Sequence, residues 1–163
     1  MLTDIGEFIV GAYLQIEEKC DVVDYNVRPS GGGLKGLHEF DVIGLNFKTD
    51  TVFFCEVSTH IRGLKYKTLE RVRKKHERQK LFAKQYKDNF EHHKFMFWSP
   101  YVPRGKVSKG LSKIDGLELI INGDYKRRVD DLRSRAKDET HDARNPFFRM
   151  LQITEHMKDW PVE

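Results

Sequence analysis

Two acidic side chains in the first third of the chain have the type and the spacing needed for metal-ion chemistry. Asp41 lies in the segment FDVIGL and Glu56 in the segment VFFCEV, and both segments are typical of β-strands. If the two strands pair as a hairpin about residues 46–50, Asp41 lies nearly opposite Glu56. Two carboxylates placed together repel each other and are costly to desolvate. A divalent cation removes that cost, and hard oxygen ligands favour Mg²⁺ or Mn²⁺.

The charge of the chain is distributed unevenly around this pair. The net charge is +4, but residues 1–59 carry four Lys and Arg against ten Asp and Glu, whereas residues 60–106 carry fourteen against four. Residues 107–163 carry eleven of each. This pattern indicates a polyanionic partner, namely nucleic acid, although a solvated lysine-rich face is the alternative. The residues expected to contact phosphates are Arg71, Arg73, Lys74, Lys75, Arg78 and Lys80.

Hydrophobic periodicity indicates the elements that must position these side chains. Helices are predicted near residues 5–20, 67–90, 125–137 and 147–157, with a short helical turn near 107–113. Strands are predicted near residues 21–27, 38–47, 51–59, 94–98 and 117–121. A three-strand meander followed by helical crossovers predicts an α/β fold with a mixed central sheet of about five strands, flanked by helices. A flexible loop is predicted at residues 30–33, which read SGGG.

This order of elements and the segment HEFDVIGLNFKTDTVFFCEVST resemble the PD-(D/E)XK nuclease superfamily, which has the restriction-endonuclease-like fold. The resemblance covers about residues 4–122 of what is expected to be a single domain, residues 1–163, with two further helices within about residues 125–160. It implies hydrolysis of phosphodiester bonds in nucleic acid, expected to be DNA, with Mg²⁺ or Mn²⁺. It also implies that Asp41 and Glu56 are metal ligands. The backbone carbonyl of Val57 would be a third contact, and Glu7 an outer or second-metal ligand.

Ser58 departs from the family pattern, which has Glu-x-Lys where this chain has Glu56-Val57-Ser58. The family's lysine orients or helps deprotonate the attacking water and stabilises negative charge, and an uncharged hydroxyl cannot replace that charge. A lysine from elsewhere could enter the site, and the candidates are Lys65, Lys67 and Lys75. His60, on the same strand face as Glu56, could instead assist the water. The third alternative is a degenerate module that binds nucleic acid or a protein partner without cleavage. These alternatives remain open at the level of the sequence.

Cysteine usage and hydropathy indicate where the protein works. Cys20 and Cys55 are too few for a disulfide framework or a four-ligand zinc site, and they are predicted to be buried thiols. Neither a signal peptide nor a membrane span is expected. The chain is therefore expected to be cytoplasmic and to have no membrane partner, and a homodimer is left open.

Four further residues have predicted environments. Trp98 is expected to be buried in its strand, and His76 is expected to be partly exposed where it interrupts an apolar helix stripe. His92 and His93 are expected to lie in a loop, because no second pair of zinc ligands has suitable spacing.

Overall fold

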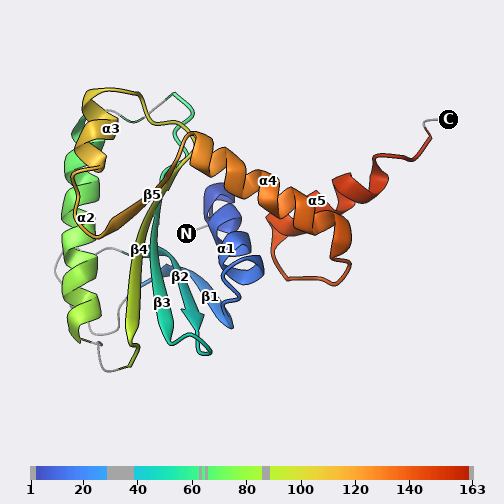
Figure 1. Cartoon of the computed structure of the whole chain (residues 1–163), viewed down its shortest axis with the longest axis horizontal. Coiled ribbons are helices and arrows are strands. Elements are labelled where there is room, and N and C mark those ends of the chain that lie inside the picture. The colour runs from blue at the N-terminus through green and yellow to red at the C-terminus, as the bar shows by residue number, and fades with distance from the viewer. Residues whose placement is uncertain (1–2, 29–38, 63, 65, 86–88, 162–163) are drawn as a thin grey trace.

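A five-stranded mixed sheet forms the centre of the molecule. The computed structural model describes residues 3–28, 39–62, 64, 66–85 and 89–161, and the loop predicted at residues 30–33 lies outside them. The strands lie side by side in sequence order: β1 (Val22–Val27), β2 (Phe40–Asn46), β3 (Thr51–Val57), β4 (His92–Ser99) and β5 (Leu117–Ile121). β1, β2 and β3 pair antiparallel, and β3, β4 and β5 pair parallel. The predicted α/β fold with a mixed sheet of five strands is confirmed, and β3 is the central strand (Figure 1).

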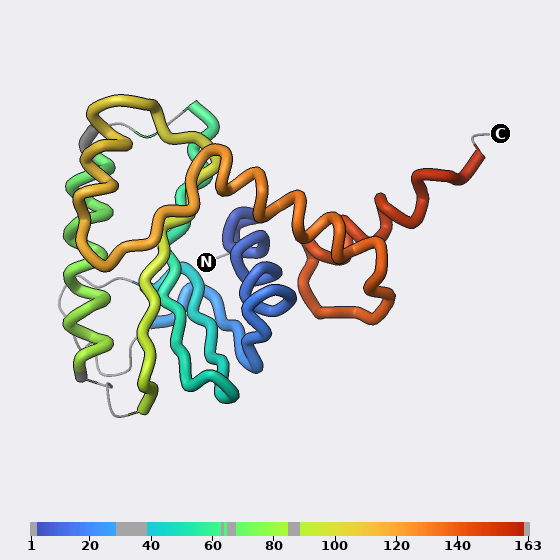
Figure 2. Tube along the Cα trace, in the orientation of Figure 1, coloured from blue at the N-terminus to red at the C-terminus, as the bar shows by residue number. Residues whose placement is uncertain are grey.

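The helices form a layer on each face of this sheet. α1 (Ile5–Ile16) covers one face, and α2 (Tyr66–Gln85) and α3 (Lys106–Leu111) cover the other. α4 (Gly123–Asp138) runs from β5 past α1, and α5 (Pro146–Met157) packs against α4 and α1. Figure 2 shows that α5 and the C-terminal segment extend away from the sheet. None of the helices within the described ranges is both long and apolar enough to cross a membrane.

α1 begins with a capping box that also fixes its position beside β3. The Asp4 carboxylate accepts a hydrogen bond from the N–H of Gly6, and the Glu7 carboxylate accepts one from the backbone N–H of Asp4. Gly6 has no room for a side chain, because a Cβ there would lie 2.1 Å from Thr59 Cγ2. The first turn of α1 therefore lies close to the segment that follows β3, and this proximity brings Glu7 near the end of that strand.

The register of the β2–β3 hairpin decides which side chains face which helix layer. Val42 pairs with Cys55, and both side chains belong to the core beneath α1. The adjacent pair, Ile43 and Phe54, belongs to the core beneath α2. Because a shift by one residue would exchange the two faces, this register places Glu56 on the α2 side of the sheet.

The buried side of α2 contains two polar residues, and one of them contradicts a prediction from the sequence. His76 and Gln79 are 2% and 1% exposed, so the predicted partial exposure of His76 is wrong. His76 Nε2 lies 2.9 Å from the carbonyl oxygen of Asp115, and because a carbonyl only accepts, this nitrogen carries the proton. The ring packs edge-on against Phe95. The hydrogen bond to Asp115 and the contact with Phe95 hold this imidazole in the core, although its Nδ1 has no hydrogen-bond partner among the described residues.

Two element boundaries in the structure also differ from those predicted from the sequence. His92 and His93 pair with β3 as the first residues of β4, so their predicted place in a loop is wrong. The parallel ladder continues to them because β3 supplies backbone partners along its whole length. Phe90, predicted to be in the last turn of α2, lies outside the helix and stacks on Phe47. Trp98 is completely buried, as predicted.

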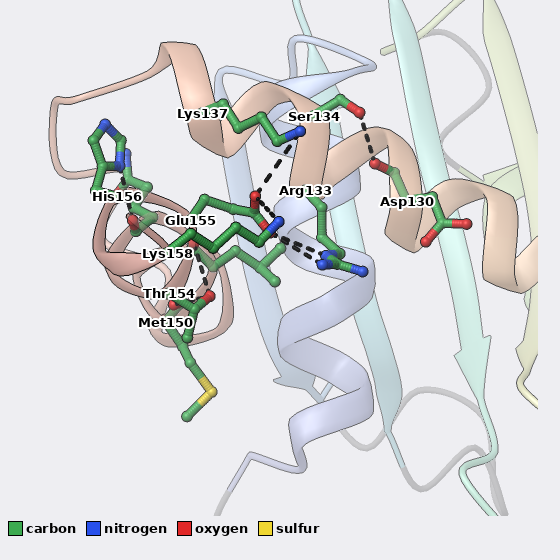
Figure 3. A network of polar contacts seen from close by, with 11 residues as sticks. Asp130, Arg133, Ser134, Lys137, Met150, Thr154, Glu155, His156 and Lys158 are labelled. Atoms are coloured by element: carbon green, nitrogen blue, oxygen red, sulfur yellow. Dashed lines mark hydrogen bonds and ion pairs between the residues drawn. The ribbon is translucent and has the colours of Figure 1, made fainter. Parts of the chain in front are cut away.

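A buried carboxylate joins α4 to α5 (Figure 3). The Glu155 side chain is 2% exposed and lies among Arg133, Lys137 and Lys158. Arg133 donates to Glu155 Oε1 at 3.1 Å, and Lys158 Nζ donates to Oε2 at 2.6 Å. The hydrogen bond from Lys158, together with that from Arg133, lowers the pKa of Glu155 below its usual value. This ion-pair network connects α5 to α4.

We expect Glu155→Gln to lower the Tm and to speed amide hydrogen exchange in α5, because a neutral amide cannot balance three cations. A carboxyl with a lowered pKa stabilises the fold at neutral pH, and that contribution is lost as the pH falls through the lowered value. The wild type and Glu155→Gln should therefore converge in acid. Glu139→Gln, which alters a carboxylate that is 35% exposed, is the matched control. Equal exchange rates in α5 for wild type and Glu155→Gln would contradict this role.

Candidate active site

The ends of β2 and β3 bring Asp41 and Glu56 together. The pairing of Val42 with Cys55, extended by one step, places Asp41 opposite Glu56. The backbone N–H of Val57 donates to Asp41 Oδ2 at 2.8 Å, which fixes the carboxylate against β3. The side chains of Asp41 and Glu56 are 12% and 14% exposed. The two carboxylates indicated by the sequence thus lie together and are largely shielded from water.

Lys75 of α2 lies between these two carboxylates. Its Nζ is 2.9 Å from Asp41 Oδ1 and forms an ion pair with Glu56 Oε2. Burial by itself would lower the pKa of Lys75, but the charges of Glu56 and Asp41 outweigh burial and raise it. The ammonium group therefore remains protonated. Lys75 is one of the three lysines that could replace the basic group missing at Ser58, and its side chain lies at the carboxylates.

Glu56 is the electrostatically unfavourable member of this cluster. Burial, reinforced by the negative charge of Asp41, raises the pKa of Glu56 to about 8, although Lys75 acts in the opposite direction. Asp41 accepts hydrogen bonds from Val57 and Lys75, one at each oxygen. The site therefore holds one well-satisfied carboxylate beside another that binds a proton or a cation readily at neutral pH.

A pocket of about 650 Å³ opens beside the pair. It is lined by the carboxylates Glu7, Glu39, Asp41, Glu56 and Glu70 and by basic residues of α2. Four of the six predicted phosphate contacts line this pocket: Arg71, Lys74, Lys75 and Arg78. Their spacing of three, one and three residues places them on one face of the helix. Arg73 and Lys80, the other two predicted contacts, are exposed on α2 but do not line the pocket.

Glu7 lines the same pocket from α1. Its Oε2 accepts two hydrogen bonds of 3.0 Å, one from the backbone N–H of Asp4 and one from Asn26 Nδ2. Burial raises the pKa of Glu7, and the nearby charge of Asp41 adds to the rise, while both hydrogen bonds oppose it. The pocket thus receives Glu7 from α1, Asp41 from β2 and Glu56 from β3, besides Glu39 and Glu70.

The remaining predicted catalytic residues lie elsewhere. β3 ends at Val57, and the backbone N–H of Ser58 donates to the carbonyl of Trp98. Neither Ser58 nor His60 lines the pocket, and His60 is exposed. Lys65 lies outside the described residues, as does the side chain of Lys67.

The carboxylates of the pocket bear on the binding of a divalent cation. Within the described ranges, no group of three or more His, Cys, Asp or Glu side chains is placed to hold a metal ion. Asp41, Glu56 and the carbonyl of Val57 nevertheless suit Mg²⁺, which typically uses one or two protein carboxylates and keeps several waters. Mn²⁺ has similar ligand preferences. Lys75 would have to leave the space between the carboxylates for a cation to share them.

The sequence did not indicate Glu39 and Glu70, which line the pocket, or Asn26, which contacts Glu7; an uncharged residue in a strand carries no obvious chemistry. A signal for Lys75 was present in the helix pattern. Lys75 follows buried Val72 by three residues and precedes buried Gln79 by four, so it borders the apolar stripe of α2. A lysine at that border can reach the sheet, whereas Arg73 cannot.

Comparisons with protein-family models, with curated proteins and with solved structures find no match for this chain. The geometry of the pocket is therefore the basis for the function proposed below.

The raised pKa of Glu56 predicts that the metal-free protein loses stability as the pH rises. The folded protein holds this proton up to about pH 8, whereas the unfolded chain releases it near 4.5. A raised carboxyl pKa therefore costs stability progressively as the pH rises from the lower to the higher value. Lys75 does not titrate in this window, because its pKa lies above 10.5. From pH 6 to pH 8 we expect a loss on the order of 2 kcal/mol in the free energy of unfolding.

Urea denaturation at pH 6, 7 and 8 with a chelator present measures this loss. Glu56→Gln removes the titrating group and should flatten the dependence, while Glu118→Gln, a carboxylate of β5 that is 47% exposed, should leave it unchanged. A wild-type profile as flat as that of Glu56→Gln would contradict the raised pKa.

Proposed function

We propose that this chain is a metal-dependent nuclease that hydrolyses phosphodiester bonds in nucleic acid, with DNA as the expected substrate. The observation that carries the proposal is the position of Lys75, which contacts both Asp41 and Glu56. The resemblance to the PD-(D/E)XK nucleases requires a basic group beside the two acidic residues, and Ser58 does not supply one. A lysine from α2 can supply it. Buried free thiols at Cys20 and Cys55 are in keeping with the proposed cytoplasmic location.

The residues of the pocket have distinct proposed roles. Asp41 and Glu56, with the carbonyl of Val57, would hold Mg²⁺ or Mn²⁺. When bound, such an ion would lower the pKa of a water and neutralise charge on the phosphoryl group. Lys75 would orient the attacking water and stabilise the negative charge that develops on the phosphoryl oxygens. Its high pKa suits a donor that stays charged, rather than a base.

The basic wall of the pocket would hold the nucleic-acid backbone. Arg71, Lys74 and Arg78 lie on the same face of α2 as Lys75. Contacts from such residues neutralise phosphates and position a strand without reading its sequence. Because these basic residues line the same pocket as Asp41 and Glu56, a phosphate held by α2 would lie near the acidic pair.

A second candidate function is a module that binds nucleic acid without cleaving it. One observation favours it: Lys75 already lies between Asp41 and Glu56 and balances part of their negative charge without a metal ion. Such a module would show salt-sensitive, metal-independent binding and no turnover with any cation. The further carboxylates of the pocket, Glu7, Glu39 and Glu70, count against it, because added negative charge weakens the binding of a polyanion.

Substitutions in the cluster should separate metal ligands from the water-orienting residue. We expect Asp41→Asn and Glu56→Gln to abolish Mg²⁺-dependent cleavage of labelled DNA or RNA and to weaken Mn²⁺ binding. Lys75→Met should slow cleavage by about 100-fold or more. It should not weaken Mn²⁺ binding, because it removes a positive charge from between the two carboxylates.

Cleavage is measured with Mg²⁺ and Mn²⁺, and metal binding by titration with Mn²⁺ in the absence of nucleic acid. Glu118→Gln, outside the pocket, is the control for carboxylate loss in the sheet, and circular dichroism checks folding of every variant. Cleavage that survives both Asp41→Asn and Glu56→Gln would rule out the nuclease assignment. Binding of nucleic acid without cleavage by the wild type would favour the second candidate.

The two faces of α2 provide a matched test of nucleic-acid binding. We expect Arg71→Ala, Lys74→Ala and Arg78→Ala to weaken binding and to reduce the salt dependence of the Kd, by about one unit of slope per lost phosphate contact. Arg73→Ala and Lys80→Ala each remove one positive charge, as each of the three pocket variants does, but from the part of α2 outside the pocket. Each of them should have a smaller effect. Fluorescence anisotropy over a series of salt concentrations measures both quantities. Equal losses from the two sets would show that only net charge matters.

A further inference from the structure

Asn26 adopts an unusual backbone conformation beside the pocket. Its φ is +52°, in the left-handed region that non-glycine residues rarely adopt and that asparagine tolerates better than most. β1 pairs with β2 at Tyr25–Val42 and at Val27–Phe40, but not at the position between them, where Asn26 would pair with Asp41. The ladder is thus interrupted next to a carboxylate of the pocket. Backbone strain at such a place indicates a functional constraint.

The side chain of Asn26 connects β1 to Glu7 of α1. Its Nδ2 donates to Glu7 Oε2 at 3.0 Å. The N–H of Asp4 donates to the same oxygen and completes the capping box. The capping box alone is enough to stabilise the start of α1, so the bond from Asn26 is additional. It fixes the Glu7 carboxylate relative to the sheet that carries Asp41.

We propose that Asn26 is a positioning residue, which holds Glu7 at the pocket for the divalent cation of the proposed nuclease. This inference rests on the proposed function and extends it to a residue that carries no charge. With Asn26 in place, Glu7 keeps one fixed orientation beside Asp41, and Glu7 Oε1 accepts no hydrogen bond from the described residues. Without it, Glu7 is tied only to its own helix and can turn away from the sheet. Asn26 thus acts on the cation through Glu7 alone.

The backbone conformation of Asn26 allows its side chain to be tested separately. Asn26→Gly keeps access to positive φ and removes the side chain that carries the amide. Lys19→Gly is the matched control, because Lys19 also has positive φ, 54°, and does not line the pocket. Any general effect of glycine at such a position appears in both variants, whereas loss of the contact with Glu7 appears only in Asn26→Gly.

The decisive experiment is a double-mutant cycle of Asn26→Gly and Glu7→Gln in the full chain. Two quantities are measured: the Kd for Mn²⁺ without nucleic acid, and the Mg²⁺ concentration that gives half-maximal cleavage. We expect Asn26→Gly to raise both by about 10-fold, as is typical when a residue that orients a ligand is removed. Combined with Glu7→Gln, Asn26→Gly should have no further effect, because Asn26 acts through Glu7. A purely structural role would add the same loss in either background.

The outcomes separate this inference from the function on which it rests. If the wild type cleaves but Asn26→Gly matches Lys19→Gly in both quantities, Asn26 is not a positioning residue and the nuclease assignment stands. Additive losses in the double variant also overturn the inference, since Asn26 would then act independently of Glu7. If the wild type neither cleaves nor binds Mn²⁺, the proposed function fails, and the role of Asn26 fails with it.

Discussion

The contact of one ammonium group with two carboxylates determines how α2 lies against the sheet. Lys75 forms ion pairs with Asp41 of β2 and with Glu56 of β3, so one residue of α2 contacts two neighbouring strands. Removing either the ammonium group or the carboxylates leaves an unpaired charge in a largely buried place, which typically costs about 3–5 kcal/mol. The cluster therefore favours one rotation of α2 about its axis. That rotation places Val72 and His76 in the core and the basic row of the helix at the pocket.

Two buried glutamates in this molecule show how local charge decides their chemistry. Glu155 lies among three cations and has no carboxylate in its network, so its pKa is lowered and its role is structural. Glu56 lies beside one cation and one carboxylate, so burial and Asp41 raise its pKa despite Lys75. The first arrangement is fully compensated. In the second arrangement the negative charge is not fully balanced, and such imbalance is characteristic of binding and catalytic sites.

This cluster of charges lies at one end of the sheet. β2 starts and β3 ends there, α1 starts there with Glu7, and β1 departs from regular pairing at Asn26. Backbone ladders satisfy the centre of the sheet, whereas side chains complete the hydrogen bonding at its end, as Asp41 does for Val57. α4 and α5 lie on the α1 side and contribute nothing to the pocket. The Glu155 network and the acidic pocket thus lie in different parts of the molecule.

The sequence by itself determined the elements, their order and the acidic pair, because these follow from local rules. Alternation along β2 and the apolar run of β3 predict a hairpin, and a hairpin with a short turn has few registers. The position of Asp41 opposite Glu56 was therefore predictable. The buried place of His76 was not predictable from its own type, because it depends on the carbonyl of Asp115, 39 residues away.

Only the tertiary structure decided which lysine meets the carboxylates and which residue holds Glu7. The pattern of charges treats the six predicted phosphate contacts of α2 alike, but in the folded molecule Lys75 lies at the acidic pair, whereas Arg73 is exposed to solvent. Asn26 reaches Glu7 because β1 and α1 lie side by side, which no local spacing encodes. Side-chain type and periodicity fix what each element can do, and three-dimensional packing fixes which of those groups come within contact distance.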